Sequence, residues 1–97
     1  MSGQEGQALV LTGPLVMDTA HEVLQRTSGT AGQRDLAIDF SQTTDIDSSA
    51  LALMMQWRRE AEAAGKRVAF VNVPDNLRVL AELYGVAFLL DQHPVPD

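Results

Sequence analysis

Short runs of apolar residues separated by helical patterns dominate this chain. Residues 8–12 and 67–73 are β-prone runs and predict strands. Residues 36–40 form a nearly continuous apolar run, which is typical of a central strand covered on both faces. Residues 87–90 fit either a last short strand or an apolar packing segment. The strand pattern therefore predicts a sheet of about four strands.

Helical spacing fills the gaps between these strands. Thr19, followed three residues later by Glu22, predicts a capping box at the start of a first helix. The longest helix is expected over residues 48–64, with Gly65 as its C-terminal stop, and a third over residues 74–84. Strands and helices that alternate in this way predict an α/β fold, with a mostly parallel central sheet and helices packed mainly on one side.

Composition narrows the classes of function. The 97 residues suffice for one domain, residues 1–97, with residues 1–7 and 91–97 expected to fray. A net charge of −6 disfavours nucleic acid as a partner, and the absence of cysteine excludes disulfides and thiolate metal sites. No apolar stretch approaches the length of a membrane span, and residues 1–7 are polar. We therefore expect a cytoplasmic protein.

Candidate catalytic groups are sparse. His21 and His93 have no acidic partner at ligand spacing, and the chain contains no phosphate-binding glycine motif. Asp39, Asp45 and Asp47 follow or end a central strand, where carboxylates can hold a divalent cation or accept a phosphoryl group. They are also ordinary turn residues, and Asp47 is well placed to cap the next helix. We expect no catalytic residue, metal or cofactor, and keep an Asp-dependent phosphoryl acceptor or hydrolase as the least favoured alternative.

The helix that starts near Ser48 carries the most information. At 100° per residue, one side gathers the residues expected against the sheet, which are Ala50, Leu53, Met54, Trp57, Ala61 and Ala64. The other side gathers Ser48, Leu51, Ala52, Met55 and Arg59, and so includes apolar residues where a surface helix usually has polar ones. We interpret this second side as a docking surface for a partner protein. Alternatively, Leu51 lies at the border of the buried stripe and Met55 is a single exposed apolar residue.

Ser48 allows two interpretations. Serine is a favoured N-cap residue, which explains its position without any further role. A phosphoryl group at this serine would also be accommodated, because free N–H groups and the helix dipole favour an anion at a helix N-terminus.

The segment LAIDFSQTTDIDSSALAL, residues 36–53, resembles the signature of STAS domains. In that family an apolar strand leads through an Asp-Ser/Thr turn into a helix that begins with small residues and leucines. The similarity extends through RVAFVNV and LAELYGV and covers residues 8–90 at the level of pattern. The resemblance implies the STAS fold, which anti-sigma factor antagonists share. Val16 and Ala50 depart from the family, where an acidic residue and a glycine are common.

Two branches of this family suggest different functions. The chain looks closer to MlaB-like (toluene-tolerance) proteins, non-catalytic subunits that bind the ATPase of an ABC phospholipid transporter maintaining outer-membrane lipid asymmetry. Such a subunit would be membrane-associated only through that complex. Anti-sigma factor antagonists are the alternative, and there the resemblance implies phosphorylation of Ser48 by a kinase-like anti-sigma factor. A homodimer is left open. The expected partner contacts are Asp47, Ser48, Ser49, Leu51, Ala52, Met55 and Arg59.

Overall fold

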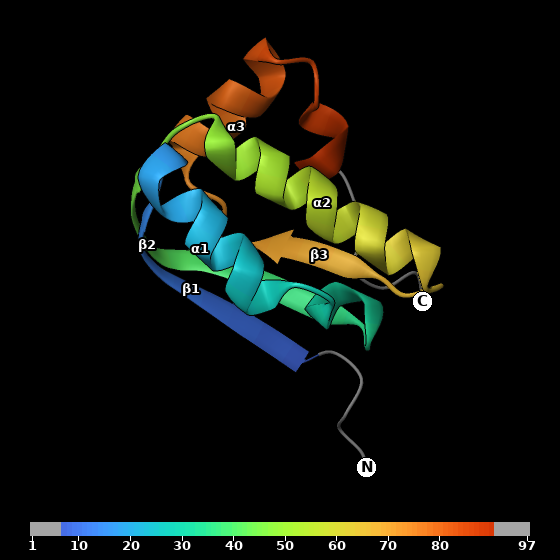
Figure 1. The fold of residues 1–97 in the computed structure, drawn as a ribbon. Coiled ribbons are helices and arrows are strands. Elements are labelled where there is room, and N and C mark those ends of the chain that lie inside the picture. The colour runs from blue at the N-terminus through green and yellow to red at the C-terminus, as the bar shows by residue number, and fades with distance from the viewer. Residues whose placement is uncertain (1–6, 91–97) are drawn as a thin grey trace.

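The computed structural model describes residues 7–90 (Figure 1). The expected fraying of residues 1–6 and 91–97, and the position of His93, lie outside the described residues. Gln7, which we also expected to fray, already pairs with Leu36 as the first residue of a strand.

The elements alternate between strands and helices. In chain order they are β1 (Gln7–Leu15), α1 (Met17–Thr27), the 3₁₀ helix η1 (Thr30–Gly32), β2 (Leu36–Ile46), α2 (Ser49–Ala63), β3 (Val68–Val71), α3 (Asp75–Leu83) and the 3₁₀ helix η2 (Ala87–Leu90).

The described strands form one parallel sheet in the order β1-β2-β3. Figure 1 shows α1 and α2 lying over the same face of this sheet, with α3 beside the start of α2. The predicted α/β class is therefore confirmed. The described residues contain three strands rather than about four, because residues 87–90 form η2 instead of a strand.

Strand β2 differs from its prediction in two ways. It continues to Ile46 through polar residues that resemble a turn, because β1 also continues to Leu15 and offers them parallel hydrogen-bond partners. Its residues alternate between buried and partly buried from Leu36 to Phe40, so helices cover one face and not both. The first strand, predicted over residues 8–12, continues past Gly13, which lies beside a register shift inside β1, where its φ of 80° suits glycine.

Helix α1 begins earlier than expected. Its first residue is Met17, so Thr19 lies in the first turn rather than at the cap. The Thr19 hydroxyl accepts a hydrogen bond from the Val16 N–H at 3.0 Å, in place of the predicted capping box between Thr19 and Glu22. The other two helices lie within a residue or two of their predicted ranges.

The core is centred on Trp57 of α2, whose side chain is fully buried. Its indole Nε1–H donates to the Thr27 hydroxyl at 3.0 Å, and that hydroxyl donates to the Val23 carbonyl at 2.9 Å. Phe70 of β3 lies next to the indole ring, with ring centroids 6.5 Å apart. These contacts anchor α2 to both α1 and the sheet, and leave its opposite side facing outward.

Candidate functional site

Most of the predicted partner contacts on α2 are accessible at the protein surface. Ala52 and Arg59 are exposed, and Ser48, Ser49 and Met55 are partly buried. We call these five residues the outward face of α2. Because the buried side of the same helix is anchored by Trp57, the outward face is carried on a rigid element.

Leu51 is a correction to the predicted surface. Its side chain is only 4% exposed and belongs to the hydrophobic core, together with Leu77 and Ala81 of α3. Helix α3 packs beside α2 and widens the buried side of α2 beyond the stripe that faces the sheet. Leu51 therefore contributes to the stability of this domain and does not belong to the outward face.

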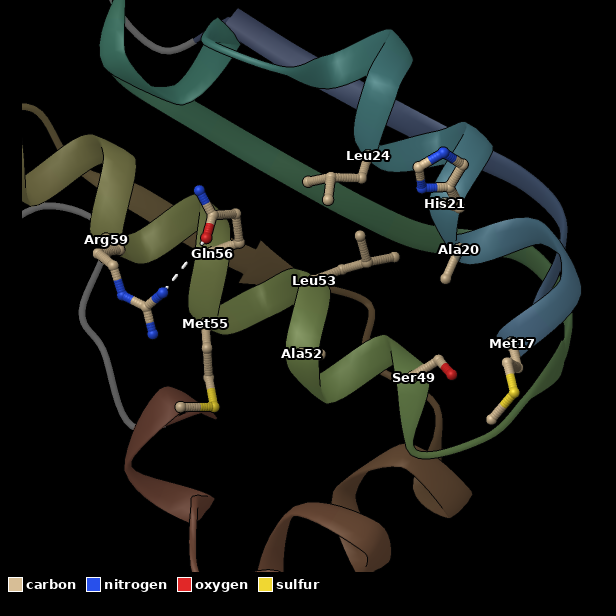
Figure 2. Close-up of a pocket in the computed structure, with 10 residues that line it drawn as sticks. All are labelled: Met17, Ala20, His21, Leu24, Ser49, Ala52, Leu53, Met55, Gln56 and Arg59. Atoms are coloured by element: carbon tan, nitrogen blue, oxygen red, sulfur yellow. Dashed lines mark hydrogen bonds between the residues drawn. The ribbon is translucent and has the colours of Figure 1, made fainter.

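A groove of about 490 Å³ runs between α1 and α2 (Figure 2). Its α1 wall consists of Met17, Ala20, His21 and Leu24. Its α2 wall consists of Ser49, Ala52, Leu53, Met55, Gln56 and Arg59. Four of the five residues of the outward face thus line the α1–α2 groove, which gives that face a concave, largely apolar floor.

The contribution of α1 was missed by sequence reasoning. Met17 is 75% exposed at one end of the groove, yet the predicted helix began only at Thr19. His21, for which the sequence showed no acidic partner at ligand spacing, is exposed and lies on the groove wall opposite α2. The available signal was the apolar Met17 at the start of an otherwise polar turn, but its meaning depends on α1 and α2 being neighbours.

Asp47 joins the starts of α1 and α2. One carboxylate oxygen, Oδ1, accepts a hydrogen bond from the Ser49 N–H at 2.8 Å, and the other, Oδ2, accepts one from the Met17 N–H at 3.1 Å. The Asp47 N–H donates to the Leu15 carbonyl at 3.3 Å. The Ser49 hydrogen bond is the main reason that the pKa of Asp47 lies below its ordinary value. Asp47 thus helps to hold together one end of the α1–α2 groove.

Ser48 does not cap α2 with its own side chain. The first turn is satisfied by other acceptors, since the Ala50 N–H donates to the Asp47 carbonyl at 3.0 Å and the Leu51 N–H donates to the Ser48 carbonyl at 3.0 Å. The N–H groups of Ser49, Ala50 and Leu51 therefore already have acceptors within the protein and are not free to bind a phosphoryl group at Ser48.

The three aspartates proposed as a cation or phosphoryl site do not act as a unit. Asp39 accepts hydrogen bonds from the Ser41 N–H at 2.8 Å and the Asn72 side-chain amide at 3.0 Å, and chiefly the first lowers its pKa. Asp47 has the separate partners described above, and Asp45 is exposed. Within residues 7–90, no group of three His, Asp or Glu side chains is arranged to hold a metal ion.

A smaller hollow, of about 170 Å³, lies on the other side of the outward face, between α2 and η2. Arg58, Glu62 and Phe88 line this hollow. The Arg58 Nε donates to Glu62 at 3.0 Å, and the Arg58 guanidinium lies 5.3 Å from the centre of the Phe88 ring. Met55 and Arg59 line both hollows. They form the ridge between the α1–α2 groove and η2.

Comparison with known proteins agrees with this fold. The family model described as the Mlab STAS domain matches residues 2–91 of the chain. Among solved structures, the chain is similar to one described as the anti-sigma factor antagonist SpoIIAA in its unphosphorylated form. The TM-score is 0.72 with 22% sequence identity, and the alignment covers 93% of this chain and 81% of that one. At that identity the likeness shows a shared fold. The search among curated protein sequences gave no match. In the described part of the chain, no helix has the length and apolar character to span a membrane.

Proposed function

This chain belongs to the Mlab STAS domain family, and from that premise we propose that it is a regulatory subunit that binds the ATPase of an ABC phospholipid transporter. The transporter would be one that maintains the lipid asymmetry of the outer membrane. The chain would act in the cytoplasm and meet the membrane only through the complex. It would contribute binding rather than catalysis, and would stabilise or activate ATP hydrolysis by its partner.

The observation that carries the proposal is the mixed character of the outward face of α2. Ala52 and Met55 supply apolar area, while Ser48 and Arg59 supply polar contacts at either end. This combination of an apolar centre with a polar rim is the usual anatomy of a protein interface. Because Trp57 anchors the opposite side of α2, the outward face is already ordered and loses little conformational entropy when a partner binds.

The absence of catalysis is supported by the state of the candidate acidic groups. Asp39 and Asp47 each accept two hydrogen bonds from the protein itself, and each of those bonds organises a loop or a helix start. Carboxylates engaged in this way are structural acceptors. A sharp Mg²⁺ requirement for a phosphatase or ATPase activity of the isolated chain would contradict this part of the proposal.

Co-purification followed by reconstitution tests the proposal. The tagged chain is recovered from its own organism and the bound proteins are identified, and a transporter ATPase is expected among them. The purified ATPase is then assayed for ATP hydrolysis with and without the chain. Recovery of the ATPase together with higher or longer-lived activity supports the proposal. An ATPase that neither binds the purified chain nor changes its activity overturns it.

A second candidate is an anti-sigma factor antagonist regulated by phosphorylation of Ser48. The observation that favours it is that the Ser48 side chain caps no helix N–H, so its hydroxyl is available for another role. Incubation of the chain with a kinase-like anti-sigma factor and ATP should then add one phosphoryl group, and Ser48→Ala should abolish the mass increase. Binding of a kinase-like protein instead of a transporter ATPase would select this second function.

A further inference from the structure

We propose that the α1–α2 groove receives an amphipathic helix of the partner, oriented so that one of its carboxylates meets Arg59. The inference rests on the proposed function and deepens it, because it specifies which kind of element the outward face of α2 binds. The groove, rather than α2 alone, is then the contact surface.

The length and the two walls of the α1–α2 groove fit a bound helix. Its two walls run side by side from the Met17 and Ser49 end, and Arg59 stands at the other end (Figure 2). Arg59 lies ten positions after Ser49 along α2, which corresponds to a length of about 15 Å and matches about three turns of a partner helix. The small side chains of Ala20 and Ala52 allow a partner backbone to approach closely.

The chemistry of the walls favours a helix over an extended segment. An extended peptide would place backbone N–H and C=O groups over a floor formed largely by alkyl groups, such as those of Leu24, Leu53 and Ala52. Those backbone groups would lose water without gaining partners. A helix satisfies its backbone internally and presents only side chains to the floor. Met17 and Met55 have flexible side chains that can adjust to the partner's side chains.

Charge gives the bound helix a direction. Among the described residues that line the groove, Arg59 is the only one with a formal charge when His21 is neutral. The Arg59 guanidinium donates a hydrogen bond to the Gln56 side chain at 3.3 Å. Because Gln56 is neutral, this bond does not neutralise the positive charge of Arg59. At the opposite end, the Asp47 carboxylate offsets the positive ends of the α1 and α2 dipoles. A partner carboxylate is therefore stabilised at the Arg59 end and not at the other.

Two matched substitutions on α2 test the groove. Ala52 and Ala63 are both exposed alanines on α2, but only Ala52 lines the groove. Ala52→Glu is expected to weaken binding of the purified transporter ATPase by more than about tenfold, whereas Ala63→Glu adds the same charge and should leave binding nearly unchanged. Circular dichroism and the fluorescence of Trp57 show that each variant is folded. Equal binding by the two variants overturns the groove as the contact surface, while the proposed function stands.

Cross-linking and charge exchange then test the occupant. The chain has no cysteine, so Met17→Cys carries a thiol-reactive photo-cross-linker at one defined position. The cross-link should reach a surface helix of the ATPase. Arg59→Glu should weaken binding, and reversal of one acidic residue on that helix to Arg should restore it. Cross-links to a loop, a strand or a second copy of the chain, or a lack of rescue, overturn the inference. Failure of the unmodified chain to bind any ATPase overturns the proposed function as well.

Discussion

The Asp47 carboxylate accepts a hydrogen bond from the Met17 N–H at 3.1 Å, although thirty positions separate the two residues. The same carboxylate accepts the Ser49 N–H at 2.8 Å. A single side chain therefore fixes the start of α1 relative to the start of α2. Since Met17 and Ser49 both line the groove, the stability of this end of the groove depends on the charge and length of one aspartate.

Replacement of Asp47 should show this dependence through pH. The Ser49 hydrogen bond, assisted by the weaker one from Met17, holds the folded-state pKa of Asp47 below 3.8, its ordinary value, although partial desolvation acts in the opposite direction. The stabilisation is thus complete above the unfolded-state pKa and is lost as pH falls through the lower, folded-state pKa. Asp47→Asn should lower Tm by several degrees at neutral pH, and its difference from the unmodified chain should narrow on strong acidification.

Asp45→Asn is the control for this experiment. Asp45 lies two residues earlier, is exposed, and its replacement removes the same charge. Thermal unfolding of both variants between about pH 7 and pH 2, followed by the fluorescence of the single tryptophan, distinguishes them. Equal effects of the two substitutions on Tm would mean that the Asp47 hydrogen bonds do not hold the helices.

Ser48→Ala should leave stability almost unchanged. A serine that caps a helix with its side chain typically contributes about 1 kcal/mol, but the Ser48 hydroxyl makes no such bond. We therefore expect a change below about 0.5 kcal/mol in the free energy of unfolding, measured by urea titration. A loss near the full capping value would show that Ser48, and not Asp47, caps α2 in solution.

Leu51→Ala should destabilise the domain by about 2–4 kcal/mol, because it removes a buried side chain and leaves a cavity beneath α3. Met55→Ala should cost less, since Met55 is only partly buried. Urea unfolding measures both. The folded fraction of Leu51→Ala should still bind the partner. Unchanged stability together with lost binding would show that Leu51 contacts the partner and not the core.

Thr27→Val should cost about 1–3 kcal/mol despite its similar volume, because it leaves the buried Trp57 indole N–H without an acceptor. Trp57→Phe removes the donor as well as part of the ring, so the double variant isolates the bond. The pair should show a coupling energy in a double-mutant cycle of urea unfolding. Additive effects would indicate that the hydrogen bond contributes nothing beyond packing.

The sequence predicted the class of fold well, because the periodicity of individual elements survives in the structure. The α2 stripe around Trp57 and the stop at Gly65 are local properties of the chain, although Ala64, predicted in that stripe, follows the end of α2 and is exposed. Leu51 was misplaced because a helical pattern contains no information about a second neighbour, and α3 covers that side. The polar end of β2 was missed for a related reason, since its strand conformation depends on pairing with β1.

Only one wall of the α1–α2 groove could be predicted from the sequence. The α2 wall follows from helical spacing, but the α1 wall requires that two distant segments lie side by side. The role of Asp47 was partly foreseen, as a cap for the helix that follows it. Its second bond, to Met17, depends on where β1 ends and could not be obtained from spacing alone.

The all-parallel sheet has a consequence for how this domain is made. Leu36 pairs with both Gln7 and Val68, and a helix intervenes in the chain on each side, so no local hairpin can nucleate the sheet. Pairing of the strands therefore requires contacts between distant parts of the chain, which slows folding relative to a helical bundle of equal size. The α1–α2 groove therefore exists only once the sheet has formed, so a nascent or partly unfolded chain would not present this surface to a partner protein.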